Sequence, residues 1–187
     1  MAHYLIKTSE FITVGESSYF NGTMKRKGTG KITIGSYCAF GDNLNLIAGN
    51  NHGYGYAAIQ VGFYRKHFPH MRYPGYVKPC GIKIGSDVWI GDNVTILDGA
   101  SVGNGVVIAA GAVVPGKTYE DYSIIGGVPA KTVKMRFPDH VKRALIELSW
   151  WDKSSDWVSR NSHFFSQDLS NMSESKSTRL LASLSDT

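Results

Sequence analysis

Isoleucine or valine recurs at every sixth position along the middle of the chain. The anchors are Ile84, Ile90, Ile96, Val102, Ile108 and Val114. The fourth residue after each anchor is small, and these residues are Val88, Val94, Ala100, Val106, Ala112 and Thr118. A period of six fits neither an amphipathic helix nor a half-buried strand. It predicts an all-β solenoid with three flat faces, in which each face contributes one inward anchor and one inward small residue.

A shorter block of the same repeat lies earlier in the chain. Its anchors, Ile34, Phe40 and Leu46, make one three-sided turn, and Val14 marks an earlier and rougher rung. Continuing in sixes from residue 34 leads to residue 82, whereas the second block is anchored on Ile84. This slip predicts that a non-repetitive segment is inserted between the two blocks.

The inserted segment, about residues 52–81 and called the insert below, is rich in aromatic residues. They are Tyr54, Tyr56, Phe63, Tyr64, Phe68, Tyr73 and Tyr76. A loop of this length in a compact domain is usually functional or disordered, and so many aromatic side chains argue against disorder. We therefore expect the insert to pack on its own coil or on a neighbouring subunit.

The repeat loosens after Val114, and a helical stretch is predicted from Asp139 to about Trp151, with Asp139 as its N-cap. The last residues are rich in serine and show little periodicity before Leu180. A solenoid needs its ends covered, which the helix can do. The expected organisation is a coil over residues 1–131, a helical cap over 132–160 and a partly mobile tail over 161–187.

Composition narrows the range of partners. The net charge is +5, from 20 Lys and Arg against 15 Asp and Glu. The basic residues form separate clusters rather than one run, so we expect no nucleic-acid partner. No apolar run approaches the roughly 20 residues that span a bilayer. The start of the chain lacks a secretion signal, so a cytoplasmic protein without a membrane span is predicted.

The two cysteines, Cys38 and Cys80, are not spaced as metal ligands and are expected to be small buried hydrophobic residues. His67 and His70 are three residues apart and could be metal ligands. They lie in the irregular insert rather than on the rungs. We therefore expect no metal, and a zinc enzyme of the carbonic anhydrase type remains the alternative.

Three segments resemble the left-handed parallel β-helix acyltransferases that are built on hexapeptide repeats. They are IGSDVWIGDNVTILDGA at 84–100, IAAGAVV at 108–114 and IGGVPAK at 125–131. The stretch ALIELSWWD at 144–152 is similar to the tail helix of the xenobiotic acetyltransferases, which modify streptogramins and chloramphenicol. The resemblance spans about residues 12–158. It implies a left-handed parallel β-helix with a long inserted loop and a short C-terminal α-helix.

The chain departs from that branch at two places. Residues 153–155 (Lys-Ser-Ser) stand where the branch commonly has Trp or Leu followed by Pro, and the insert does not match the acceptor loop of the branch. The resemblance therefore implies the reaction, acetyl transfer from acetyl-CoA, more narrowly than the acceptor. The acceptor is expected to be a hydroxyl of a saccharide or small molecule, with an antibiotic-like molecule or an amino sugar as the alternative.

His52 is the candidate catalytic residue. It follows Asn50 and Asn51 where the first block ends, and the resembling family carries its catalytic histidine in an Asn-His at the start of the long loop. Histidine suits a general base that takes the acceptor proton as the acceptor attacks the thioester. We expect a backbone carbonyl or a carboxylate to hold the other ring nitrogen, and a backbone N–H to stabilise the oxyanion. The alternative is a histidine with a purely structural hydrogen bond.

The coenzyme and acceptor contacts are predicted in two places. The small residues Ala109, Ala110 and Gly111 offer a flat edge for the pantetheine arm of acetyl-CoA. By resemblance, Gly127 and Ala130 lie beside that arm and Lys131 reaches a phosphate. Lys134 and Arg136 could add charge. Candidate acceptor contacts are Asn51, Tyr54 and Tyr56.

The resemblance also implies a homotrimer with its active sites between subunits. The outer faces of the coil are flat, which favours association of subunits side by side. A non-catalytic β-helix that serves as a binding module is the remaining alternative.

Overall fold

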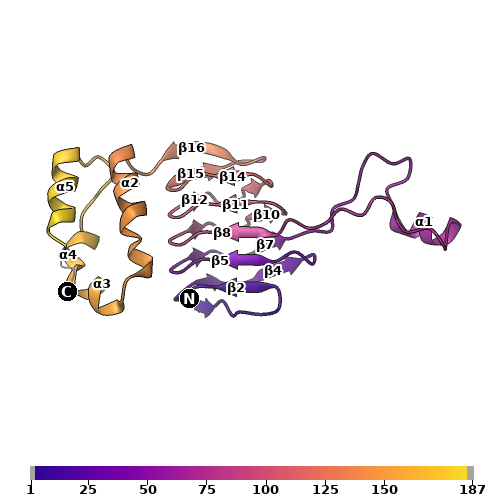
Figure 1. The fold of residues 1–187 in the computed structure, drawn as a ribbon, viewed down its shortest axis with the longest axis horizontal. Helices are drawn as coiled ribbons and strands as arrows, with labels where there is room; N and C mark the ends of the chain where they lie inside the picture. Colours follow the sequence, from indigo (N-terminus) through magenta and orange to yellow (C-terminus); the bar gives the residue numbers. More distant parts are fainter. Residues whose placement is uncertain (1–2, 185–187) are drawn as a thin grey trace.

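The computed structural model describes residues 3–184 and has three parts (Figure 1). A left-handed β-helix lies in the centre, the insert extends away from one side of it, and short helices cover the opposite side. The coil has three faces, each a sheet of short strands stacked along the coil axis. The predicted fold class is therefore confirmed.

The strands of each face follow one another up the coil. The first face contains β2 (Ile12–Val14), β5 (Ile32–Ile34), β8 (Ile82–Ile84), β11 (Ser101–Val102) and β14 (Thr118–Tyr119). The second contains β1 (His3–Leu5), β3 (Tyr19–Asn21), β6 (Ala39–Phe40), β9 (Trp89–Ile90), β12 (Val107–Ile108), β15 (Ser123–Gly126) and β16 (Lys131–Met135). The third contains β4 (Met24–Lys27), β7 (Leu44–Ile47), β10 (Thr95–Leu97) and β13 (Val113–Val114).

The anchors of the repeat stack in register to form the core. Ile34 pairs with Ile84, and Ile84 pairs with Val102 on the next turn. The six anchors from 84 to 114 are each no more than 4% exposed. Stacking at the spacing of β-strands places each anchor directly on the next, which explains why aliphatic residues recur at fixed intervals. At the last strand of the first face, β14, Thr118 is exposed and Tyr119 takes the inward position, because the repeat loosens there.

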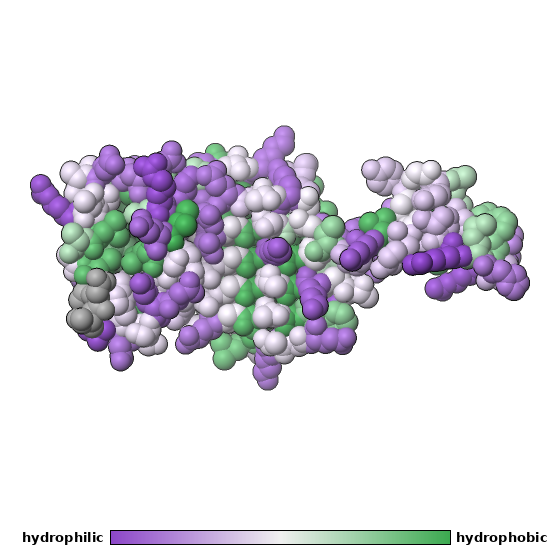
Figure 2. Space-filling view, in the orientation of Figure 1, coloured by the Kyte–Doolittle hydropathy of each residue, from purple (hydrophilic) through white to green (hydrophobic). Residues whose placement is uncertain are grey.

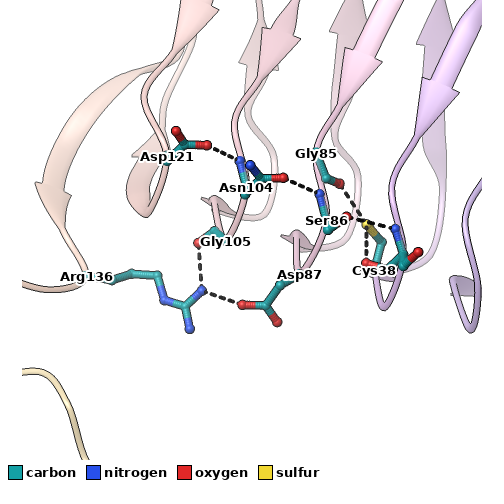
Figure 3. Close-up of polar contacts among 9 residues, drawn as sticks. Cys38, Gly85, Ser86, Asp87, Asn104, Gly105, Asp121 and Arg136 are labelled. Carbon is teal, nitrogen blue, oxygen red and sulfur yellow. Dashed lines mark hydrogen bonds and ion pairs between the residues drawn. The ribbon is translucent and has the colours of Figure 1, made fainter. Parts of the chain in front are cut away.

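Polar side chains at the corner between the first and second faces join consecutive turns. The Ser86 N–H donates to the Asn104 side chain at 2.8 Å, and the Asn104 N–H donates to Asp121 at 2.5 Å (Figure 3). The glycine before Ser86 is required here because a Cβ on Gly85 would lie 2.7 Å from the backbone nitrogen of Asn104. The repeat thus specifies the outer corner as well as the core.

The C-terminal region contains more helix than the sequence predicted. Its helices are α2 (Asp139–Leu148), the 3-10 helix η1 (Trp150–Asp152), α3 (Ser155–Arg160), α4 (Ser162–Phe165) and α5 (Glu174–Ala182). Helices α4 and α5 lie in the segment expected to be an aperiodic tail. They contribute Phe164, Leu180 and Leu181 to a second hydrophobic core around Leu145 and Trp151. Packing on α2 stabilises helices that are too short to show a clear period.

The prediction that Asp139 is the N-cap of α2 was wrong. Pro138 holds the cap position with an extended backbone, and α2 begins at Asp139. The Asp139 carboxylate lies 3.2 Å from the Lys142 ammonium in the first turn. There it is favourably placed relative to the helix dipole, although it caps no backbone N–H.

The insert leaves the coil after β7, returns at β8 and packs mainly on itself. Its short helix α1 (Val61–His67) lies at the far end (Figure 1). Tyr64 of α1 is 9% exposed and its ring contacts those of Phe63, Phe68 and Tyr73. Figure 2 shows the insert as an arm whose far end has both polar and apolar surface. No described helix is long and apolar enough to cross a bilayer.

The prediction that both cysteines are buried holds for one of them. Cys38 lies inside the coil, where burial raises the pKa of its thiol to about 11. Cys80 is exposed. It lies at the end of the insert, outside the repeat, and its backbone N–H donates to the Asp98 carboxylate.

Candidate functional site

Both ends of the insert are held on the coil by one carboxylate. Asp98 follows β10 and accepts a hydrogen bond from the Asn51 side chain at 2.9 Å. It also accepts bonds from the backbone N–H groups of Cys80, at 3.1 Å, and Gly81, at 2.8 Å. Asn51 leads directly into His52, so this clamp fixes the position of His52 relative to the third face.

His52 lies where the outgoing and returning connections of the insert meet. It forms an antiparallel bridge with Tyr76, and the Gly53 N–H donates to the Gly75 carbonyl at 2.8 Å. Its ring is exposed, and its Nδ1 lies 3.2 Å from the hydroxyl of Tyr73. The sequence predicted a backbone carbonyl or a carboxylate at this nitrogen. A phenol is there instead, and the nearest carbonyl in this chain of bonds is Ile59, which accepts from Tyr73 at 2.6 Å.

A cavity of about 520 Å³ opens beside His52. Its lining offers the hydroxyl of Thr29, the amides of Asn50 and Asn51, and the ammonium of Lys27. The remaining surface is apolar or aromatic and comes from Val61, Tyr73, Tyr76, Val77 and Pro79. This mixture of hydrogen-bonding groups and flat rings suits a small polar molecule that carries a hydroxyl.

Of the predicted acceptor contacts, only Asn51 lines this cavity. Tyr54 is 91% exposed and Tyr56 is 45% exposed, and both lie outside the lining. Tyr73 and Tyr76 occupy the lining, and sequence reasoning missed them. The sequence held a signal for them. The insert leaves the coil and returns to it, so the residues at its start must lie close to the residues just before the repeat resumes.

The six predicted coenzyme contacts come together on two adjacent turns. They lie at the corner between the second and third faces. The Ala109 N–H donates to the Ile125 carbonyl at 2.9 Å, and the Val113 N–H donates to the Gly127 carbonyl at 3.1 Å. Gly111 has a φ of +71°, and a Cβ there would meet no described atom within 4 Å.

Most of this corner is open to solvent and lined by small residues. Ala109, Ala110, Gly111 and Gly127 are exposed, while Ala130 is buried in the core of the coil. Lys131 is exposed beside Gly126 at the start of β16 and makes no ion pair with a described residue. We call residues 109–111 and 127–131 the shelf. The shelf fits an extended chain that hydrogen-bonds to backbone, with a free cation at one end.

The shelf and His52 are separated within one chain. The shelf lies at the corner between the second and third faces, and His52 lies near the corner between the third and first faces. The strands of the third face, such as β10, run from one of these corners to the other. The insert extends outward from the coil instead of folding back over the third face (Figure 1). No shelf residue belongs to the lining of the cavity beside His52 among the described residues.

Arg136 has a structural role in place of the phosphate contact that was considered for it. Its guanidinium donates to the Gly105 carbonyl at 2.7 Å and pairs with Asp87 at 3.2 Å (Figure 3). It also lies over the ring of Phe137, 4.8 Å from the centroid. Burial raises the pKa of the Asp87 carboxyl, and the nearby guanidinium partly opposes this shift. These contacts hold the link that precedes α2 on the coil.

Among the described residues, the two histidines considered as metal ligands belong to no group of side chains that could complete a metal site. His67 lies against the Phe63 ring, with centroids 4.9 Å apart. Within residues 3–184, no three His, Cys, Asp or Glu side chains converge as a metal site.

Comparison with known proteins identifies the family. The family model described as bacterial transferase hexapeptide (six repeats) matches residues 81–116. A chloramphenicol acetyltransferase from Klebsiella aerogenes is 33% identical over 165 residues, which cover 79% of this chain and 78% of the relative.

Two solved structures share the fold at moderate identity. A maltose O-acetyltransferase from Clostridium difficile 630 is 27% identical with a TM-score of 0.53, over 67% of this chain and 59% of its own. A hexapeptide-repeat acetyltransferase from Vibrio cholerae, solved with acetyl coenzyme A, is 25% identical with a TM-score of 0.55, over 67% and 61%. The chain thus spans about six tenths of these two proteins. Its coil, its repeat and its relatives together show that it belongs to the hexapeptide-repeat acetyltransferases.

Proposed function

We propose that the protein moves the acetyl group of acetyl-CoA to a hydroxyl of a small molecule or saccharide, with His52 as general base. The observation that carries this proposal is the exposed His52 ring beside a cavity with a mixed polar and aromatic lining, in a chain that belongs to an acetyltransferase family. Histidine can remove a proton near neutral pH and return it later in the same cycle.

His52 has two steps to perform. Its unprotonated ring nitrogen first removes the acceptor proton, while the acceptor oxygen forms a bond to the carbonyl carbon of the thioester. The tetrahedral centre then collapses, the carbon–sulfur bond breaks, and the imidazolium returns the proton to the leaving sulfur. Backbone N–H groups held in place by the coil are suited to stabilise the oxyanion, because they need no reorganisation during the reaction.

The shelf is the proposed coenzyme site. Acetyl-CoA supplies the activated acetyl group, and its pantetheine arm carries amides that can bond to backbone. The exposed small residues at 109–111 would let that arm approach closely, Gly127 and Ala130 would lie beside it, and Lys131 would neutralise a phosphate. The relative from Vibrio cholerae that was solved with acetyl coenzyme A supports the choice of co-substrate.

The cavity favours an acceptor rich in hydroxyl groups. Thr29, Asn50 and Lys27 offer hydrogen-bond donors, while Tyr73 and Tyr76 offer flat rings on which a sugar can pack. The maltose O-acetyltransferase among the structural relatives is consistent with a saccharide. An antibiotic-like acceptor is the second candidate, since the relative at 33% identity is named for chloramphenicol.

We further propose that two copies of the chain form each site. The shelf and His52 lie at different corners of one coil, so His52 of one copy would meet the shelf of its neighbour. A homotrimer satisfies this requirement at three equivalent interfaces. The predicted acceptor contacts Tyr54 and Tyr56, which lie outside the cavity lining of the single chain, would then be free to reach a neighbouring copy.

The test is replacement of His52 with Ala, with thiol release from acetyl-CoA measured over a panel of sugars and of antibiotic-like alcohols. We expect turnover to fall by a factor of about 100 or more, in the range typical of a lost general base, with acetyl-CoA binding retained. His70→Ala, in the same insert but outside the cavity lining, is the matched control and should keep its activity. Undiminished turnover by His52→Ala on a true acceptor would refute the mechanism.

A further inference from the structure

The Tyr73 hydroxyl lies between two groups but has only one hydrogen to donate. Its oxygen is 2.6 Å from the carbonyl oxygen of Ile59 and 3.2 Å from Nδ1 of His52. A carbonyl can only accept, so the tyrosine hydrogen must point to Ile59 for that short contact to be a hydrogen bond. The Tyr73 oxygen is then left as an acceptor towards His52.

This arrangement determines which nitrogen of His52 carries the proton. We propose that Tyr73 is a positioning residue that holds neutral His52 with its proton on Nδ1 and the lone pair on Nε2. The tautomer of a histidine is set by the partner of its other nitrogen, and only the nitrogen with a lone pair can act as a base. The inference rests on the proposed function of His52 as the base, and it adds the atom that accepts the proton.

Tyr73 is itself fixed on three sides. The buried ring of Tyr64 meets the Tyr73 ring edge to face, with centroids 5.2 Å apart and planes at 68°. The His52 ring contacts it from another side at 6.1 Å and 70°. Gly75 leaves room for the hydroxyl, because a Cβ at that position would lie only 2.5 Å from the Tyr73 oxygen. The aromatic cluster of the insert therefore supports the orientation of His52.

The same contacts give a reason for the length and composition of the insert. An exposed histidine on a loop would otherwise rotate freely and exchange between tautomers. The bridge to Tyr76 holds its backbone, and Tyr73 holds its ring. A base that is pre-oriented in this way loses less entropy when the acceptor binds.

The tautomer can be observed directly by long-range ¹H–¹⁵N NMR on uniformly labelled protein, at alkaline pH where histidine rings are neutral. Comparison with the spectrum of His52→Ala assigns the His52 signals. In the wild type we expect the proton on Nδ1, and in Tyr73→Phe a mixture of the two tautomers. Turnover of Tyr73→Phe should fall about threefold to tenfold at unchanged KM for acetyl-CoA, as the loss of one neutral hydrogen bond implies.

Two further variants separate the hydroxyl contact from the fold of the insert. Gly75→Ala keeps the Tyr73 hydroxyl but displaces it, and should reproduce the tautomer mixture. Tyr64→Phe removes a hydroxyl that makes no hydrogen bond within residues 3–184 and keeps the packed ring, so it should match the wild type in tautomer and turnover.

A wild-type proton on Nε2, or an unchanged tautomer in Tyr73→Phe or Gly75→Ala, would overturn the inference while leaving His52 as the base. An active His52→Ala enzyme would instead refute the proposed function, whatever the tautomer of the wild type.

Discussion

At the residue scale, the two cysteines differ in exposure, although the sequence predicted that both are buried. Cys38 is 0% exposed, and burial raises the pKa of its thiol to about 11. A thiol reacts as its thiolate, so Cys38 should be inert in the folded protein. Cys80 is exposed at the end of the insert.

We therefore expect dithionitrobenzoate at pH 8 to label one thiol per chain in the native protein and two in guanidinium chloride. Cys80→Ser should abolish the native reaction, and Cys38→Ala should leave it unchanged. Two thiols reacting rapidly in the native protein would show that the coil opens around Cys38.

The ion pair between Asp87 and Arg136 has a predictable dependence on pH. Burial raises the pKa of Asp87, so the folded protein holds this proton more tightly than the unfolded chain does. The contribution of this carboxyl to stability is thus most favourable at low pH and is lost as the pH rises through its raised pKa. Arg136 reduces that loss by pairing with the ionised form.

Replacing Arg136 with Met keeps the packing on Phe137 and removes the charge. At pH 7 we expect the free energy of unfolding to fall by about 1–2 kcal/mol, less than for a fully buried pair because both side chains are partly exposed. Near pH 3, where Asp87 is protonated, the difference from wild type should shrink to the part that comes from the lost hydrogen bond to the Gly105 carbonyl. Urea unfolding at both pH values measures this. An Asp87→Asn change added to Arg136→Met should recover part of the loss at pH 7, and an equal loss at both pH values would contradict the assignment.

At the element scale, the insert is attached to the coil at Asp98, which directly follows β10. Asp98 accepts bonds from Asn51, Cys80 and Gly81, which lie on both connections to the coil. Asp98→Ala should therefore loosen the base of the insert without affecting the core. Amide hydrogen exchange should accelerate at residues 50–53 and 75–81, while β8 to β13 stay protected. Turnover should fall because His52 is held less firmly.

Asp92→Ala is the matched control for this variant. Asp92 also accepts a backbone N–H from an adjacent turn, that of Asp42 at 2.7 Å, but it lies at a corner away from the insert. Its loss should leave exchange in the insert unchanged. Equal exchange at the insert base in Asp98→Ala and in the wild type would mean that the aromatic cluster alone holds the insert in place.

The sequence predicted best those elements in which buried residues recur at a fixed spacing. Every coil anchor from Ile84 to Val114 stacks on an equivalent residue, so one pattern specifies the whole core. Because that spacing is fixed, the slip between the two blocks of the repeat located the insert. The partners of His52 could not be predicted in this way, because the insert has no period and the contact with Tyr73 crosses 21 residues. Helices α4 and α5 were missed because packing on α2, rather than local pattern, stabilises them.

At the scale of the whole molecule, one chain holds the two parts of the proposed site apart. His52 and its cavity lie beyond one corner of the coil, and the shelf lies at another, with the third face between them. If neighbouring copies complete each site, a defect in His52 and a defect in the shelf can complement each other when they are on different chains. If one chain were sufficient, mixing two defective chains would restore nothing.

We expect His52→Ala and Ala110→Trp to be nearly inactive when each is prepared alone, the second because the indole would cover the shelf. When the two are co-expressed in equal amounts and assemble at random, each site in a trimer draws His52 from one chain and the shelf from the next. Both are intact in about one quarter of the sites, so about one quarter of the wild-type activity should return. A double variant carrying both changes on one chain, mixed with the wild type, controls for assembly. Recovery near zero, from mixtures shown by mass to contain both chains, would mean that the insert of each chain serves its own shelf.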